Sequence, residues 1–186
     1  LFLALVVMLS FSVTAFAAGA TGSITIQSNT DVSVEGKTLR AYKILDVKSY
    51  TSDSVVYTVP EALKEFYKTR YSLNGNEGDF DAQVVGKIKE ESDLFAFAAA
   101  ALAAAKAANI APGTATAGEG ATSVTISELP LGYYVVEDAG AATPISALIL
   151  DTTNPDVTLE IKADQPGIEK KNDGDTDTED TTEGLI

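Results

Sequence analysis

The stretch "TSVTISELPLGYYVVEDAGAATPISALILDTTNPDVTLEIK", residues 122–162, decides the fold class of this chain of 186 residues. It holds four apolar or alternating runs with the pattern of β-strands, and they begin about ten to twelve residues apart. These runs are residues 122–127, 132–137, 144–150 and 156–162. Short strands at this spacing are typical of a β-sandwich of immunoglobulin type.

The last of these runs ends with a lysine, Lys162, whose role is open. Val157, Leu159 and Ile161 alternate with polar residues, which is the pattern of a strand with one buried face. Lys162 is then expected on the opposite, solvated face at the strand end. Two interpretations are open there: an ordinary surface charge, or an amine that is presented for reaction.

Earlier in the chain, strand-like runs are followed by runs with helical spacing of apolar residues. They are residues 22–27, 38–47 and 54–59, then residues 60–71, 79–91 and 92–109. A flexible loop is expected at residues 113–121, which are rich in Gly, Ala and Thr. Strands, helices and strands again predict a mainly β fold, an immunoglobulin-like β-sandwich with a helical insertion between the early and late strands. A parallel α/β fold would instead alternate strands and helices throughout.

The alanine-rich run at residues 92–109 favours a packed helix inside the domain. Its uninterrupted apolar part, residues 94–105, is shorter than the ~20 residues that a membrane-spanning helix needs, and Lys106 follows at once. Ser92 or Asp93 can cap its first turn.

Residues 1–17 predict a signal peptide. An uncharged apolar run leads to Ala15-Phe16-Ala17, a small-x-small site of the kind that signal peptidase cleaves. Because an initiating Met and a basic segment do not precede the run, we expect the signal peptide to be truncated at its start. The domain that follows is expected to span residues 18–165, outside the cell.

Composition narrows the chemistry that this domain can perform. The chain contains no cysteine and no histidine, which excludes disulfides, thiolate and Ser-His-Asp nucleophiles, and the commonest ligands of catalytic zinc. A net charge of −14 argues against nucleic acid or an anionic membrane as a partner. These features favour a structural protein over an enzyme.

Residues 172–186 are acidic and contain no Lys or Arg, which is typical of a solvated linker. An EF-hand calcium loop needs Gly at its sixth position and Glu at its twelfth. Counted from Asp173, those positions are Thr178 and Gly184. We therefore expect no metal site of this kind and no cofactor, although looser calcium binding stays open.

Three motifs carry a resemblance to a known family: "AYKILD" (41–46), "ELPLGYYVVED" (128–138) and "DTTNPDVTLEIK" (151–162). In this order, after a signal peptide and around a helical block, they make the chain similar to the N-terminal domain of sortase-assembled pilins of Gram-positive bacteria. More narrowly, it resembles the isopeptide-forming fimbrial proteins. The resemblance covers roughly residues 18–171.

The resemblance implies a role for Lys162. In pilin shafts, the last strand of the N-terminal domain carries a V-x-V-Y-P-K motif whose lysine attacks the acyl-enzyme formed on the next subunit. "VTLEIK" occupies the matching place, with Lys162 at the nucleophile position. Ile161 replaces the proline and Glu160 the tyrosine, so the match is partial.

It also implies a role for Glu137. In this family a Y-x-L-x-E strand supplies the E-box glutamate, and "GYYVVE" places Glu137 there. That glutamate would either order the neighbouring strand by accepting hydrogen bonds or assist isopeptide formation. The alternative is a surface acid at a strand end.

An isopeptide bond within this domain is not expected. Lys43 and Glu137 could supply the amine and the acid, but the final strand contains no Asn, and Asn154 just before it is the nearest candidate. Residues 166–186 instead resemble the beginning of a second, truncated isopeptide-forming domain. Lys170 or Lys171 would be its lysine.

The sequence therefore predicts a structural subunit of a covalently polymerised pilus, secreted and located at the cell wall. Its partners would be a sortase and other pilin subunits. The alternative is an accessory or tip adhesin that binds a host surface protein or glycan without propagating the shaft. A carboxylate-based hydrolase is a third possibility, without a positive sign in the sequence, since it needs two acids ~5–10 Å apart in a cleft.

Overall fold

The computed structural model describes residues 20–50, 55–74, 79–141, 144–150 and 154–161. Within them the chain forms eight strands and a helical segment, so the mainly β class is confirmed. The strands are β1 (Thr21–Gln27), β2 (Thr38–Tyr50), β3 (Val55–Thr58), β4 (Gly113–Thr116), β5 (Ser123–Pro130), β6 (Gly132–Asp138), β7 (Pro144–Leu150) and β8 (Asp156–Glu160). The helical segment lies between β3 and β4 and comprises η1 (Glu61–Leu63), α1 (Lys64–Tyr71), α2 (Phe80–Lys89) and α3 (Leu94–Ala107).

The strands make two sheets. The first has the order β5-β1-β8, and the second has the order β3-β2-β6-β7 with β4 also paired to β2. β8 pairs with β1 in parallel, whereas the other pairs are antiparallel. In the three-stranded sheet, Thr25 of β1 lies opposite both Thr125 of β5 and Thr158 of β8.

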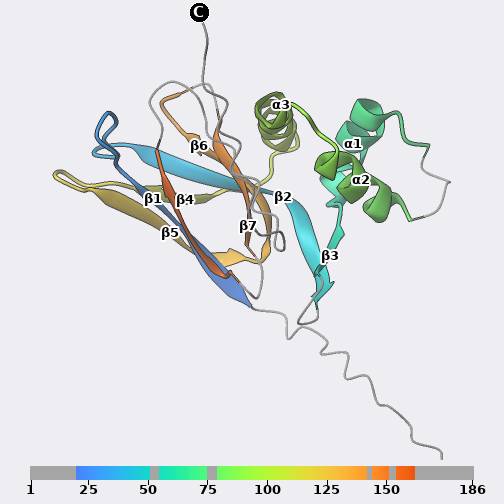
Figure 1. Ribbon diagram of the computed structural model, residues 1–186, viewed down its shortest axis with the longest axis horizontal. Helices are drawn as coiled ribbons and strands as arrows, with labels where there is room; N and C mark the ends of the chain where they lie inside the picture. Colours follow the sequence, from blue (N-terminus) through green and yellow to red (C-terminus); the bar gives the residue numbers. More distant parts are fainter. Residues whose placement is uncertain (1–19, 51–54, 75–78, 142–143, 151–153, 162–186) are drawn as a thin grey trace, which may run out of the picture.

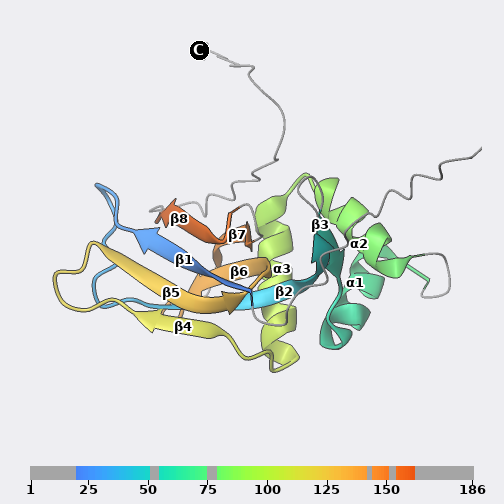
Figure 2. The same cartoon turned by 90° about the horizontal axis from the view of Figure 1, so that it is seen from below.

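Two apolar cores lie on opposite faces of the five-stranded sheet. The first, here the inter-sheet core, packs apolar residues of β1 and β5 against those of β2 and β6. The second, here the helical core, packs the other face of β2 and β6 against the helices. The molecule thus has three layers, and α3 lies between most of the strands and the other two helices, whereas β3 lies beside α1 and α2 (Figures 1 and 2).

Each helix forms where the sequence pattern predicts it. Asp93, and not Ser92, caps α3 by accepting a hydrogen bond from the Ala96 amide at 2.9 Å. Asp79 caps α2 in the same way. The alanines at one face of α3 are buried, and their small side chains let this helix pack closely against the sheet.

One local expectation is wrong. Residues 113–116 do not belong to a flexible loop, because they form β4, which pairs with Thr38–Ala41 of β2. A run of Gly, Thr and Ala has weak strand propensity by itself, so the pairing with β2 determines its structure.

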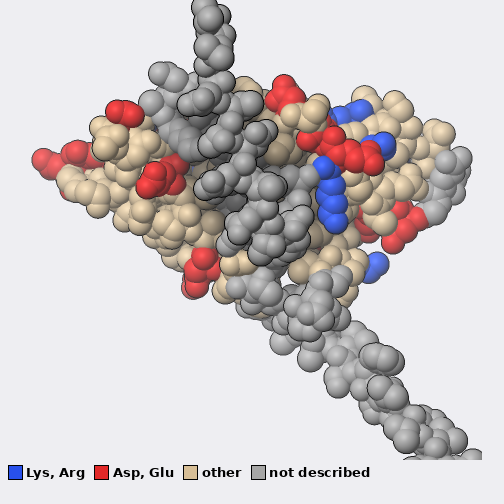
Figure 3. Space-filling model, in the orientation of Figure 1, with Lys and Arg blue, Asp and Glu red and all other residues tan. Residues whose placement is uncertain are grey.

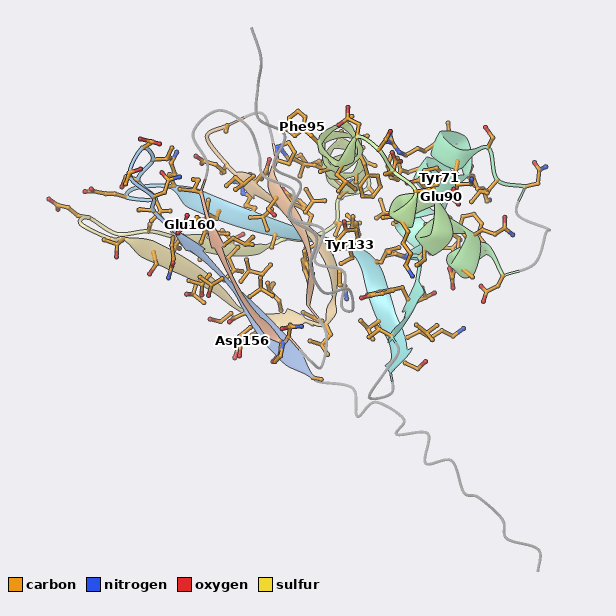
Figure 4. All side chains as sticks on the ribbon, viewed as in Figure 1. Tyr71, Glu90, Phe95, Tyr133, Asp156 and Glu160 are labelled. Atoms are coloured by element: carbon orange, nitrogen blue, oxygen red, sulfur yellow. The ribbon has the colours of Figure 1, made fainter. Side chains whose placement is uncertain are left out.

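The alternation expected in the last strand is confirmed for the described residues. Asp156, Thr158 and Glu160 are exposed, while Val157 and Leu159 are partly buried against the inter-sheet core. Ile161 is only 4% exposed. Figure 4 shows Asp156 and Glu160 at opposite ends of β8, beside β1.

Candidate functional site

The predicted site residues divide into two groups. Lys162, Lys170 and Lys171 lie outside the described residues. Glu137 lies within them, near the end of β6, and so does the strand that leads to Lys162. The site can therefore be built from the carboxylate and from the end of β8.

β6 places Glu137 on the helical side of the five-stranded sheet. This strand lies between β2 and β7, and Glu137 is opposite Arg40 of β2. Val135, two residues earlier on the same face, belongs to the helical core. Alternation along β6 therefore directs the Glu137 side chain toward α3.

Glu137 is completely buried, with an exposed fraction of 0%. A carboxylate is costly to remove from water unless charged groups and hydrogen bonds compensate it. The compensation here comes from two elements. The Tyr42 hydroxyl of β2 donates to Oε1 at 3.3 Å, Arg40 Nη1 lies 3.9 Å from Oε1, and Lys106 Nζ at the end of α3 donates to Oε2. The interpretation as a surface acid is wrong for this residue.

The two cations around Glu137 remain partly solvated. The side chains of Lys106 and Arg40 are 43% and 42% exposed, so they cover the carboxylate while keeping contact with water. The carboxylate joins α3 to β2 through charge-assisted contacts. Its contacts with Tyr42 and Arg40 are compatible with ordering the neighbouring strand; whether Glu137 also acts in isopeptide chemistry stays a prediction.

Lys43 is separated from this carboxylate. It lies opposite Tyr134, whose side chain belongs to the inter-sheet core, so Lys43 and Glu137 are on different faces of the sheet. The Lys43 ammonium instead pairs with the Asp46 carboxylate. The suggestion that Lys43 and Glu137 could together supply the amine and the acid of an internal bond is therefore wrong, because the two side chains lie on opposite faces of the sheet.

A second buried carboxylate, that of Asp138, lies next to Glu137 in β6 and is on the opposite face of the sheet. Asp138 accepts hydrogen bonds from Lys37 Nζ at 2.7 Å and from the Gly140 amide at 2.9 Å. Burial opposes ionisation of Asp138, but these two donors outweigh it and hold the pKa of the carboxyl below its ordinary value. The pair fixes the turn after β6 to the start of β2.

The end of β8 is the other half of the candidate site. Among the described strands, β8 forms one edge of the three-stranded sheet and pairs with β1, while β5 forms the other edge. At its start, the Ser23 amide donates to the Pro155 carbonyl at 2.9 Å, and at its end the Ile161 amide donates to the Gln27 carbonyl at 2.9 Å. Ile161, the residue before Lys162, is thus attached to β1 through its amide.

Gly22 permits the close approach of these two strands. A Cβ atom at this position would lie 1.8 Å from the Pro155 carbonyl oxygen, well inside van der Waals contact. Any side chain there would push the start of β8 away from β1.

Sequence reasoning did not find Tyr42, Arg40 or Lys106 as partners of Glu137. Lys106 lies 31 residues before Glu137, and only the packing of α3 on the sheet brings the two together. A signal was present in the apolar helix, which ends with a single lysine at residue 106. A lysine in the last turn of a helix is stabilised by the negative end of the helix dipole, and its ammonium can also pair with a nearby acid.

The described residues contain no cluster of three metal-ligating side chains and no helix long and apolar enough to span a membrane. Compared with known proteins, the chain matches no family model, and no curated protein matches its sequence.

Proposed function

We propose that this chain is a structural subunit of a covalently polymerised cell-surface pilus, joined to the next subunit by a sortase through Lys162. The chain itself is not an enzyme in this proposal. Its two facing sheets would be an immunoglobulin-like sandwich with the helices inserted between early and late strands. Its first and last described strands, β1 and β8, lie side by side in parallel, which supports that topology.

One observation carries the proposal: among the described strands, β8 is an edge strand, and Ile161, the residue that follows it, is anchored. An amine that must enter another protein's active site needs both access and a fixed base. The edge position of β8 supplies access, and the buried Ile161 with its bond to Gln27 supplies the base.

The charge of the three-stranded sheet bears on the access of an enzyme to the end of β8. β1, β5 and β8 contain no Lys or Arg. On the face drawn in Figure 3, the coloured basic side chains lie on the right, over the helices and beside β3, whereas acidic ones are the charged side chains visible over the strands at the left. An incoming enzyme that docks on the three-stranded sheet would therefore meet no lysine within its described strands.

The joining step is an acyl transfer. The Lys162 ammonium first loses a proton to solvent, and its nitrogen then forms a bond to the acyl carbon of the sorting signal held on the enzyme. The bond between that carbon and the enzyme's nucleophile breaks, and the leaving group takes the electron pair and a second proton. The product is an amide between two subunits. Lys170 or Lys171 would begin a second domain, and Glu137 would order β2 within the first.

The test is a gel of boiled, SDS-treated cell-wall extract from cells that produce the chain, probed with antibody to residues 18–165. Lys162→Arg is compared with Lys48→Arg, which changes an exposed lysine of β2 in the same way. We expect a high-mass ladder in the wild type and in Lys48→Arg, and its loss in Lys162→Arg. A single band near the monomer mass in the wild type would contradict the shaft role and favour an accessory adhesin.

A further inference from the structure

Two cations beside Glu137 carry hydrogen-bond donors that no described residue uses. Arg40 Nη1 lies 3.9 Å from Oε1 of Glu137, which is an ionic contact but too long for a hydrogen bond, and within the described part of the chain the Arg40 guanidinium donates to no other group. Lys106 donates to Oε2, and its ammonium has further hydrogens to donate. One buried carboxylate thus faces two partly exposed cations, and their spare donors are open to solvent.

This cation pair, Arg40 and Lys106, lies on a polar part of the sheet surface. Lys106 is in the last turn of α3, and Arg40 lies opposite Thr114 of β4, which is exposed. The hydroxyls of Thr38 and Thr116, the next pair on the same face, bond to each other at 2.9 Å on the surface. A carboxylate of another molecule can therefore approach the cation pair over side chains that are small and polar.

A group of exposed acids lacks such cations. Gln27 at the end of β1 lies opposite Ser123 of β5 and Glu160 of β8, so the loops that follow β1 and precede β5 lie beside the end of β8. The exposed acids of this region, here the acidic end, are Asp31, Glu35, Glu119 and Glu160. Within the described residues none of them pairs with a Lys or Arg, and the one lysine of these loops, Lys37, already binds Asp138. Figure 3 shows acidic side chains over the strands at the left.

We propose that the cation pair binds a carboxylate from the acidic end of a second copy of this chain. The two surfaces are complementary in charge, and a guanidinium beside an ammonium matches the two oxygens of a carboxylate. A contact between exposed charges is weak for free chains. Neighbouring subunits of a covalent polymer are held at a high effective concentration, so a weak contact is occupied there. The inference rests on the proposed function, which places copies next to one another, and it names the surfaces through which they meet.

The experiment detects the contact in the purified chain at high concentration, without a sortase. Unlabelled and isotope-labelled chains are mixed and treated with a carbodiimide, which joins a lysine amine to a carboxylate in contact with it, and digests are analysed by mass spectrometry. A cross-linked peptide with mixed labels comes from two copies. Arg40→Gln is compared with Lys48→Gln, which removes the same charge from an exposed residue elsewhere on β2. The urea midpoint of each variant shows whether it is folded.

We expect mixed-label peptides that join Lys106 to the acidic end. Their yield should be about fivefold lower in Arg40→Gln and unchanged in Lys48→Gln, with both variants folded. Absence of mixed-label links at Lys106 in the wild type would overturn the inference, and so would equal yields in the two variants. Failure of the proposed function is separate, since it is read from the cell-wall gel and leaves this cross-link in place.

A second variant identifies the occupant. It carries amides at the acidic end through the substitutions Asp31→Asn, Glu35→Gln, Glu119→Gln and Glu160→Gln. This variant should lose the mixed-label links at Lys106, whereas Glu128→Gln, which changes an exposed acid of β5 outside the acidic end, should keep them. Links that persist after the four substitutions, or that join Lys106 to other acids, would overturn the assignment of the acidic end as the partner surface.

Discussion

The helical block and strand β8 are both attached to the β-sheets, but by different interactions. The helices bury a large apolar face against the five-stranded sheet and add the ion pairs of Glu137 at one end. β8 is five residues long, exposes alternate side chains, and depends on main-chain bonds to β1 and on Ile161. The difference indicates that changes in the helical block affect global stability, whereas changes at β8 affect how the chain end is presented.

The largest expected effect is a loss of stability when the helical core is weakened. Phe97 is 0% exposed, stacks on Tyr133 at 6.5 Å between ring centroids, and lies beneath the Arg70 guanidinium. Figure 4 shows Tyr133 between the strands and the helices. Phe97→Ala should lower the free energy of unfolding by about 3–5 kcal/mol because it removes contacts and leaves a cavity.

Urea denaturation measures this change. Phe95, exposed on the same helix, supplies the control, and Phe95→Ala should change the free energy of unfolding by about 0.5 kcal/mol or less. Similar losses in the two variants would show that burial against the sheet does not stabilise the helical block.

Gly22→Ala tests the attachment of β8 to β1. The new Cβ would collide with the Pro155 carbonyl, so the first residues of β8 must move away from β1. We expect a cost of about 1–3 kcal/mol, concentrated at β8. Hydrogen exchange should show faster exchange of the Ser23 and Ile161 amides, with the helical core still protected.

Gly86 provides the matched control, since a Cβ there meets no atom within 4 Å. Gly86→Ala should be neutral or stabilising because it lies inside α2. If Gly22→Ala instead lowered hydrogen-exchange protection equally in both cores, it would contradict the view that β8 and the helical block are attached independently.

Glu137→Gln measures how much the ion pairs of this carboxylate add to the apolar contacts between α3 and the sheet. The amide keeps the shape and can accept from Tyr42, but it leaves Lys106 and Arg40 without a buried anion. Because both cations are partly exposed, water can solvate them, and we expect a loss of about 1–3 kcal/mol. Urea unfolding at low and high salt measures it, and a stability equal to that of the wild type would contradict the role of this carboxylate.

The smallest expected effect is a dependence of stability on pH, which comes from one acid in the helical region and one at the end of β6. The pKa of Asp138 is lowered beside Lys37, and the pKa of Glu91 in the helical region is lowered by Arg70 and Tyr71 against the opposing effect of burial. A carboxyl with a lower pKa in the folded state stabilises above its unfolded pKa, and this contribution disappears as the pH falls through the folded pKa. We expect about 1 kcal/mol or less from each acid between pH 6 and pH 2.

Asp138→Asn and Glu91→Gln should each flatten the low-pH part of the stability curve. Unfolding in urea at a series of pH values gives that curve for each variant. Curves that stay parallel to the wild type down to pH 2 would show that these ion pairs do not contribute.

Local patterns in the sequence predict most of the elements but not their neighbours. The alternation of Val157, Leu159 and Ile161 predicts a strand with one buried face, and the spacing of Leu63 and Tyr67 predicts a helix with a buried face. The parallel pairing of β8 with β1 depends on contacts across more than 130 residues, which no local pattern encodes. Lys106 reaches Glu137 for the same reason, through packing that brings distant segments together.

The most direct test of the central claim identifies the bond itself. Purified cell-wall polymer would be digested with trypsin and analysed by tandem mass spectrometry for branched peptides. Our account predicts a peptide in which Lys162 carries an amide-linked sorting-signal residue of another subunit, with no tryptic cleavage after residue 162. Recovery of unmodified Lys162 from the polymer, with the branch on a different lysine, would contradict it.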